Sequence, residues 1–300
     1  MKGSRRKRKI ATLRLIVFNV DAGLIAARRR GFFAGEGIEI EITPTPNSTE
    51  QMRGLGTGRW DIASTAFDNV LAWSGREGAE IVAVAQVGQG VLLPVYVRPE
   101  IRDWSDLRGK RLAVDAVDTA FALVLRRILL AHGLDLKKGD FELVPAGATG
   151  PRLDSMNRGE TFAAILNPPW DTKAEASGHK RFADHREVLP KYPGGVFAVS
   201  QTWARSHRDD LVKFLRAWLA GVRWANDPAN RDQVIKLIAE EEKLSPQAAA
   251  GRLAQLPKDG AMDLAGLQSV LDLRTQFGFQ LPMGSDLKRY CDLDYYLSAQ

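Results

Sequence analysis

The chain has a single cysteine, Cys291, and only four histidines among its 300 residues. One cysteine excludes an intramolecular disulfide and a zinc site built on cysteine pairs. No uninterrupted apolar run approaches the roughly 20 residues that a membrane-spanning helix needs. Gly-x-Ser-x-Gly, a phosphate-binding Gly-Lys-Ser and His-Glu-x-x-His are also absent from the sequence. We therefore expect no catalytic residues, no metal site and no cofactor.

Acidic residues are missing from the first ten positions, where six basic side chains account for the whole net charge of +6. The rest of the chain is neutral, which argues against a nucleic-acid-binding protein. We expect residues 1–10 to form a disordered basic tail. The alternative is the charged start of a secretory signal, but the apolar segment that should follow has the pattern of a strand. Either the start codon is placed too late, or the protein stays in the cytoplasm.

Strand and helix patterns alternate in the first part of the chain, and 45% apolar residues provide enough material for packed cores. Strands are expected at residues 13–18, 38–42, 61–64 and 81–86, with helices at 24–30, 50–56 and 70–74. This β-α-β order predicts a doubly wound parallel sheet.

A second series of the same kind begins after residue 110. Strands are expected at residues 111–114, 141–144 and 162–166, with helices at 120–132 and 152–158. From Trp203 onward the pattern is helical, with apolar faces at 211–225 and 262–277 and a Ser245-Pro246 helix start. The order predicts two α/β lobes, the second inserted into the first, with crossing segments near residues 91–97 and 194–200.

Two helix-to-strand units carry a family resemblance. The first contains IAARRRGFFAGEGIEIEI and then GTGRWDIA, and the second is DLRGKRLAV at residues 106–114. In spacing and glycine placement the chain resembles the periplasmic solute-binding proteins of the nitrate/taurine/alkanesulfonate ABC importer group, which share a fold with the thiamine pyrimidine-precursor synthases. The resemblance spans roughly residues 12–298. It departs from the family's pattern at Phe162, where an acidic residue is usual.

The resemblance implies a type II periplasmic-binding-protein fold, with two doubly wound α/β lobes, two crossover segments and a helical C-terminal part. Lobe 1 is expected to comprise residues 11–93 and 197–300, and lobe 2 residues 94–196. The synthases carry a cysteine-rich motif and a histidine in their site, and this chain lacks that motif.

Ligands of open α/β sheets bind at the carboxyl ends of the strands. The candidate ligand-binding residues in the loops expected there are Phe18, Asn19, Asp21, Asn47, Ser48, Ser64, Thr65, Asp115, Asp118, Thr119, Asn167 and Trp170. Helix capping is the competing explanation for Asp21, Asn47, Asp115 and Asp118, and it is the one we expect for Asp68 and Asn69. Trp170 either stacks on a flat ligand group or packs between structural elements.

The implied function is the solute-binding component of an ABC importer, which closes by hinge motion on a small organic molecule in the cleft between the lobes. A sulfonate, an aromatic carboxylate or a heteroaromatic compound is the expected ligand. An aromatic or heteroaromatic compound with polar substituents fits Phe18, Trp170 and the carboxylates better than nitrate or a bare sulfonate. The expected partner is an ABC permease, the expected state a monomer and the expected location the periplasm. The alternatives are a cytoplasmic enzyme of the same fold, with Asp21, Asp115 and Asp118 as paired carboxylates, and a cytoplasmic ligand sensor.

Overall fold

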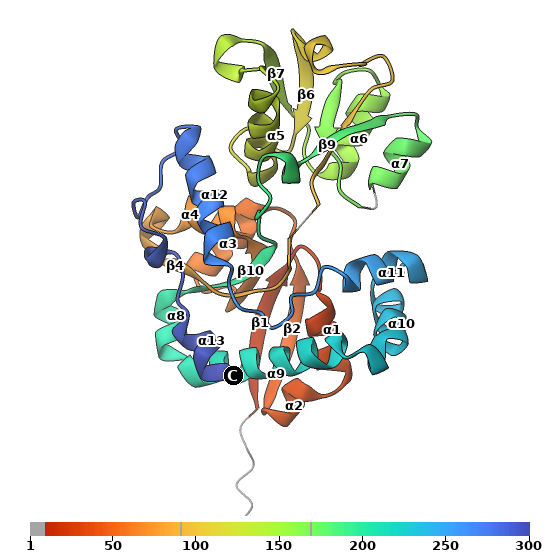
Figure 1. The fold of residues 1–300 in the computed structure, drawn as a ribbon. Helices are drawn as coiled ribbons and strands as arrows, with labels where there is room; N and C mark the ends of the chain where they lie inside the picture. Colours follow the sequence, from red (N-terminus) through yellow and green to blue (C-terminus); the bar gives the residue numbers. More distant parts are fainter. Residues whose placement is uncertain (1–9, 91, 169) are drawn as a thin grey trace, which may run out of the picture. The chain divides into compact units, whose positions relative to one another are not determined.

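The structure is a computed structural model that describes residues 10–90, 92–168 and 170–300 (Figure 1). The chain divides into two compact units. Unit 1 comprises Met1–Gln89, Pro193–Leu264 and Pro282–Gln300, and unit 2 comprises Gly90–Tyr192 and Ala265–Leu281. The predicted lobe boundaries lie a few residues later along the chain. The segment Ala265–Leu281, which was assigned to lobe 1 from sequence, belongs to unit 2.

Unit 1 is built on a five-stranded sheet with the strand order β2-β1-β3-β10-β4. Its strands are β1 (Ala11–Val17), β2 (Ile38–Pro44), β3 (Ile62–Ala66), β4 (Ile81–Gln86) and β10 (Gly195–Ser200). Its helices are α1 (Ala22–Arg29), α2 (Phe32–Gly35), α3 (Ser48–Gly56), α4 (Phe67–Trp73), α8 (Gln201–Ser206), α9 (Arg208–Asn226), α10 (Arg231–Glu242), α11 (Pro246–Leu253) and α13 (Asp294–Ala299). The strands and helices expected from periodicity are therefore confirmed in this unit, with small shifts of their ends.

The sheet of unit 1 is mixed: the four strands predicted to be parallel run in one direction, and the crossing strand β10 runs against them. Strands β1, β2 and β3 pair in parallel, whereas β10 pairs antiparallel with both β3 and β4. A strand delivered by a crossover helix is constrained to run parallel to its predecessor. Strand β10 follows the whole first segment of unit 2 instead, and that constraint does not apply to it.

Helices α1 and α9 pack against each other beside the sheet of unit 1 (Figure 1). The apolar face predicted within residues 211–225 is buried, with Phe214 and Trp218 fully enclosed and packed on Phe197 of β10. The two helices approach closely because glycines lie at the contact. A Cβ atom added to Gly221 would lie 2.3 Å from the carbonyl oxygen of Gly23, so the contact admits no side chain there.

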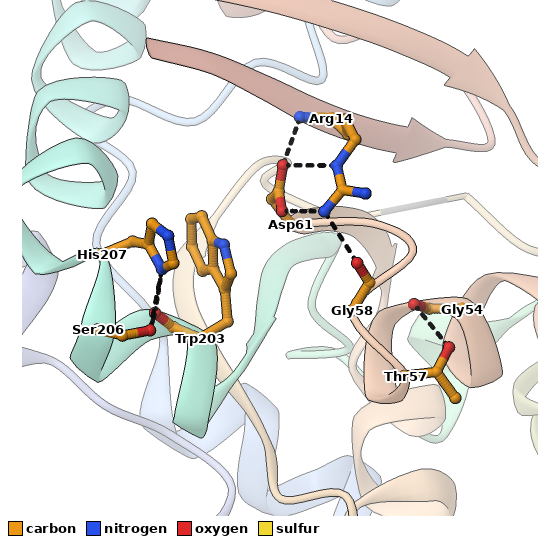
Figure 2. Close-up of polar contacts among 8 residues, drawn as sticks. All are labelled: Arg14, Gly54, Thr57, Gly58, Asp61, Trp203, Ser206 and His207. Atoms are coloured by element: carbon orange, nitrogen blue, oxygen red, sulfur yellow. Dashed lines mark hydrogen bonds and ion pairs between the residues drawn. The ribbon is translucent and has the colours of Figure 1, made fainter.

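The GTGRWDIA motif ties the start of β3 to β1 (Figure 2). The buried carboxylate of Asp61 accepts hydrogen bonds from the Arg14 backbone N (2.8 Å), Nε (3.1 Å) and Nη2 (2.7 Å). The same Nη2 donates to the carbonyl of Gly58 at 2.8 Å. Gly58 has a φ of 74°, which favours glycine. Hydrogen bonding to Asp61 raises the pKa of Arg14 above its ordinary value.

We expect Asp61→Ala to lower the free energy of unfolding by about 2 kcal/mol, because three hydrogen bonds to a buried acceptor are lost. The loss of stability should be smaller than for a fully buried ion pair, because the Arg14 side chain is 43% exposed. Urea denaturation measures the change. The matched control is Glu142→Ala, which removes a solvent-exposed partner 3.9 Å from Arg111 and should change stability by less than about 0.5 kcal/mol. Equal losses for both variants would contradict the prediction.

Unit 2 is built on a five-stranded sheet with the order β7-β6-β8-β5-β9. Its strands are β5 (Pro94–Val97), β6 (Lys110–Val114), β7 (Phe141–Pro145), β8 (Ala163–Ile165) and β9 (Lys180–Asp184). Its helices are α5 (Ala120–Ala131), α6 (Thr149–Asn157), α7 (Trp170–Ala176) and most of α12 (Leu264–Gln276). Strand β6 pairs in parallel with β7 and β8, whereas β5 is antiparallel to β8 and β9, so this sheet is mixed as well.

The two crossing segments predicted from sequence correspond to β5 and β10. Of the first predicted segment, residue 91 lies outside the described residues. Each strand enters its sheet against the direction of the parallel strands beside it.

Phe162 occupies the place in unit 2 that Asp61 occupies in unit 1. The backbone N of Phe162 donates to the Arg111 carbonyl at 2.8 Å, as the backbone N of Asp61 donates to the Arg14 carbonyl at 2.9 Å. The Phe162 ring faces two cations, with Lys110 Nζ 4.7 Å and the Arg98 guanidinium carbon 5.1 Å from its centroid. The departure from the family's pattern thus exchanges a carboxylate for a ring face that also attracts cations.

Buried arginines join helix α12 to the rest of unit 2. The guanidinium of Arg126 on α5 lies 4.0 Å from the centroid of the Phe277 ring. Arg274 on α12 is buried and donates from Nη1 to the carbonyl of Asp118 at 3.2 Å. These contacts explain why this segment belongs to unit 2 although the chain on both sides of it belongs to unit 1.

None of the helices in residues 10–90, 92–168 and 170–300 combines the length and the apolar character that crossing a bilayer requires.

Candidate functional site

The carboxyl edge of the unit 1 sheet carries a cluster of small polar side chains. The Nδ2 of Asn69 donates to Thr65 Oγ1 at 2.9 Å and to Ser48 Oγ at 3.3 Å. Thr65 and Ser64 are buried in the last residues of β3, which extends further than the predicted strand. The structure therefore places two candidate residues, Ser48 and Thr65, in one cluster, with Asn69 as the residue that links them.

Phe18 and Asn19 follow β1 at the same edge, and both are exposed. Phe18 is 47% exposed, which is unusual for a large apolar side chain at the end of a buried strand. Asn47 accepts a hydrogen bond from the backbone N of Glu50 at 2.8 Å and caps α3. The capping interpretation of Asn47 is confirmed, and a role in ligand binding stays a prediction.

Asp21 caps α1 and is held by a buried indole. Its Oδ1 accepts hydrogen bonds from the backbone N of Leu24 at 3.1 Å and from Trp218 Nε1 at 3.0 Å. The second oxygen, Oδ2, is buried and has no hydrogen-bond partner among the described residues. Burial raises the pKa of Asp21 to about 6, although the hydrogen bond from Trp218 opposes the shift. The carboxylate is thus enclosed in the α1–α9 contact.

Asp68 and Asn69 do not cap a helix, so that prediction is wrong. Helix α4 begins at Phe67, with Ala66 at the N-cap, and both residues lie in its first turn. The sequence predicts a start at residue 70, three residues too late. The helix begins at Phe67, whose buried ring belongs to the apolar face of the helix.

The carboxyl edge of the unit 2 sheet carries a second cluster, which we call the Arg152 cluster: Asp115, Thr119, Thr149, Arg152 and Asn167. Thr119 donates from Oγ1 to Asp115 Oδ1 at 2.5 Å. Arg152 donates from Nη2 to Thr149 Oγ1 at 2.7 Å, and Thr149 donates to Asn167 Oδ1 at 2.9 Å. Three predicted residues, from the ends of β6 and β8, thus lie in one network with two residues of α6.

Capping does not explain the two aspartates of this edge, and that interpretation is wrong. The N-cap of α5 is Thr119, which makes no side-chain capping bond. Asp115 instead accepts from Thr119 and lies 3.7 Å from Arg152 Nη1. Asp118 is exposed, and its backbone carbonyl accepts from Arg274.

Arg152 is the residue that sequence reasoning missed. Its side chain is 3% exposed, its guanidinium carbon lies 5.5 Å from the centroid of the Phe121 ring, and its Nε has no hydrogen-bond partner among the described residues. Burial lowers the pKa of Arg152, and Asp115 opposes the shift. No signal in the sequence points to its burial, because Arg152 stands at the start of a predicted helix, where an arginine is ordinarily exposed.

Trp170 begins α7 and packs against α6. A Cβ atom on Gly150 would lie 2.8 Å from Cη2 of its indole, and the ring is half-buried against a small core that includes Tyr96 and Leu153. Lys173 Nζ lies 4.1 Å from the ring centroid. The packing interpretation therefore holds for one side of the indole, and stacking on a ligand stays a prediction.

Two of the surface pockets in the described parts of the units contain none of the predicted residues. One, of about 280 Å³, lies beside α6 in unit 2 and is lined by Arg111, Asp154 and Arg158 among others. The other, of about 230 Å³, lies between α9 and α11 in unit 1. The described residues contain no group of three or more His, Cys, Asp or Glu side chains that could hold a metal ion. The two sheet edges offer hydroxyl and amide groups for hydrogen bonding. The charges of Arg152 and Asp115 balance each other.

Comparisons with known proteins identify the family and the fold of the chain. The NMT1-like family matches residues 9–239. YtlA of Bacillus subtilis (strain 168) carries the name of a binding protein. It is 24% identical to this chain over 222 residues, which cover 70% of this chain and 64% of YtlA. The chain thus spans slightly less than two thirds of that relative.

Two solved structures share the fold. The alkanesulfonate-binding protein SsuA from Xanthomonas axonopodis pv. citri, bound to MOPS, has a TM-score of 0.71 and 19% identity, covering 89% of this chain and 93% of SsuA. The periplasmic nitrate-binding protein NrtA from Synechocystis PCC 6803 has a TM-score of 0.77 and 14% identity, covering 97% of this chain and 88% of NrtA. The periplasmic-binding-protein fold predicted from sequence is confirmed by these likenesses.

Proposed function

Because the chain belongs to the NMT1-like family, we propose that it is the solute-binding component of an ABC importer and binds a small organic molecule. Family membership, a two-unit α/β fold and the names of YtlA, SsuA and NrtA as binding proteins support this role over catalysis. In this proposal the protein acts in the periplasm as a monomer and delivers its solute to an ABC permease. Closure by hinge motion stays a prediction.

The observation that carries the proposal is the Arg152 cluster at the carboxyl edge of the unit 2 sheet. Parallel strands with helices on both faces bind ligands at this edge. Here the edge presents the hydroxyl of Thr149 and the amide of Asn167 in one hydrogen-bonded chain with Arg152. The carboxylate of Asp115 accepts from Thr119 and pairs with Arg152 at 3.7 Å. The cluster of Ser48, Thr65 and Asn69 in unit 1 is a second candidate contact surface.

The ligand classes that we propose are a sulfonate, an aromatic carboxylate and a heteroaromatic compound. Sequence reasoning disfavoured small anions because two carboxylates were expected to repel them. Asp115 repels an anion less than a free carboxylate would, because its charge lies beside the guanidinium of Arg152. The exposed apolar side chain of Val117, 45% exposed between Asp115 and Thr119, suits the apolar body of an organic anion.

A thermal-shift screen with sulfonates, aromatic carboxylates, pyrimidines and flavins tests the function. At a ligand concentration 100 times the dissociation constant, binding should stabilise the folded protein by about 2.7 kcal/mol. Isothermal titration then gives the affinity and the stoichiometry, for which we expect one site. A screen in which no compound of the four classes raises the melting temperature would contradict the proposal.

A further inference from the structure

The hydrogen-bond network of the Arg152 cluster has a fixed direction. A guanidinium has only donors, so Thr149 Oγ1 accepts from Arg152 Nη2. The hydroxyl of Thr149 has one proton left, and it donates that proton to Asn167 Oδ1 at 2.9 Å. In this arrangement the side-chain amide of Asn167 turns its oxygen toward Thr149. Its Nδ2 then faces away from the network.

The two N–H groups of Asn167 Nδ2 have no acceptor within the described part of the chain. Asn167 is half-buried and follows β8 directly, at the sheet edge where ligands of this architecture bind. A half-buried amide with an unused donor is satisfied by water or by a ligand oxygen. The edge thus offers a donor of known orientation at the place where a solute is expected.

The charge of Arg152 is balanced by a carboxylate within the protein. Its side chain is 3% exposed, and Nη1 lies 3.7 Å from Asp115 Oδ1. An arginine enclosed in this way does not reach a solute itself, and its charge is balanced by the neighbouring carboxylate. It acts on the solute only through the groups that it holds, which makes it a positioning residue.

Resting on the function proposed above, we propose that Asn167 donates a hydrogen bond from Nδ2 to an acceptor oxygen of the solute, and that Arg152 fixes this polarity through Thr149. The solute class that this geometry favours is an organic acid whose carboxylate or sulfonate oxygen accepts from the amide. A charge-assisted bond of this kind is stronger than one between neutral groups.

The test compares acids with their amides in calorimetric titrations of the full chain. The probes are benzoate with benzamide, and benzenesulfonate with benzenesulfonamide. Wild-type protein should bind each acid more tightly than its amide. Asn167→Asp keeps the shape but replaces the donor by an acceptor, so it should weaken binding of the acids by about 10- to 100-fold and reverse the preference toward the amides. Gln280→Glu, which adds the same charge at an exposed position of unit 2, should bind as wild type does.

The positioning role is tested at Thr149. Thr149→Val removes the proton that orients the amide, and we expect the acid-over-amide preference to fall by roughly tenfold. Thr149→Ser restores the hydroxyl and should restore the preference. In ¹⁵N–¹H spectra the side-chain signals of Asn167, assigned by their loss in Asn167→Asp, should shift on addition of the tighter-binding acid in wild type and in Thr149→Ser.

The outcomes separate the two proposals. An unchanged preference for acids in Asn167→Asp overturns the role of Asn167 and leaves the solute-binding function standing. An unchanged preference in Thr149→Val overturns the positioning by Arg152. Binding of a flavin or pyrimidine in the screen without binding of either acid overturns the solute class inferred here, whereas the absence of any binding overturns the proposed function.

Discussion

The wild-type protein is expected to lose about 3 kcal/mol of stability as the pH rises from about 4 to about 7, and replacement of Asp21 by asparagine is expected to abolish this loss. The cause is the enclosure of the Asp21 carboxylate, which raises its pKa from an ordinary 3.8 to about 6. Between these two values the folded protein binds a proton that the unfolded chain has released. This stabilising contribution is complete at low pH and is lost as the pH rises through the folded-state pKa.

Asparagine keeps an oxygen for the N–H groups of Leu24 and Trp218 and carries no charge. We therefore expect the free energy of unfolding of Asp21→Asn to rise, relative to that of wild type, by about 3 kcal/mol between the low and the high end of this pH range. Urea denaturation at a series of pH values measures the difference. Asp227→Asn is the control, because Asp227 also caps a helix, through Ala229 at 2.9 Å, but is exposed. Parallel curves for Asp21→Asn and wild type would show that the carboxylate is not held in the way described.

Gly221→Ala should lower the free energy of unfolding by about 3 kcal/mol. A Cβ atom at this position would lie 2.3 Å from the carbonyl oxygen of Gly23 and 2.8 Å from the backbone N of Ala27. Both atoms belong to the backbone of α1, so the strain is relieved only by moving one helix away from the other. Such a movement would also open the buried contact between Asp21 and Trp218.

Gly251→Ala, in the same unit, is expected to change the free energy of unfolding in the opposite direction. Gly251 lies inside α11, and an added Cβ atom would meet nothing within 4 Å. Alanine should stabilise this helix by about 0.5–1 kcal/mol, because it loses less conformational freedom on folding than glycine. Thermal and urea denaturation of both variants give the comparison. A loss at Gly251 as large as that at Gly221 would show that helix contact does not explain the effect.

The strands and helices were predictable because their signals are local. The buried runs at β4 and β6 and the apolar face of α9 are visible as periodicity in the sequence. The direction of β10 was not, because it depends on how the chain returns from unit 2. The membership of α12 in unit 2 depends on contacts of Arg126 with Phe277 across more than a hundred residues, and periodicity carries no such information.

The candidate site was predictable at the level of loops and less so at the level of side chains. Asp21 and Asn47 follow the local rule for capping. Asp115 does not, because it accepts from the Thr119 hydroxyl, and its ionic partner Arg152 is brought to it by the position of α6. An arginine in a helix is ordinarily solvated, so the burial of Arg152 has no counterpart in a one-dimensional pattern.

The division of the chain has a consequence for the order of synthesis. Many multidomain proteins fold their N-terminal domain while the ribosome is still making the next one. Here the strand that joins β3 to β4 in unit 1 is synthesised only after the first segment of unit 2, and α12 of unit 2 only after most of unit 1. Neither unit is complete until residues near the C-terminus have left the ribosome. A nascent chain stalled at residue 260 should therefore be cleaved readily by protease in both units, and protection should begin only after residues 265–300 have emerged from the ribosome.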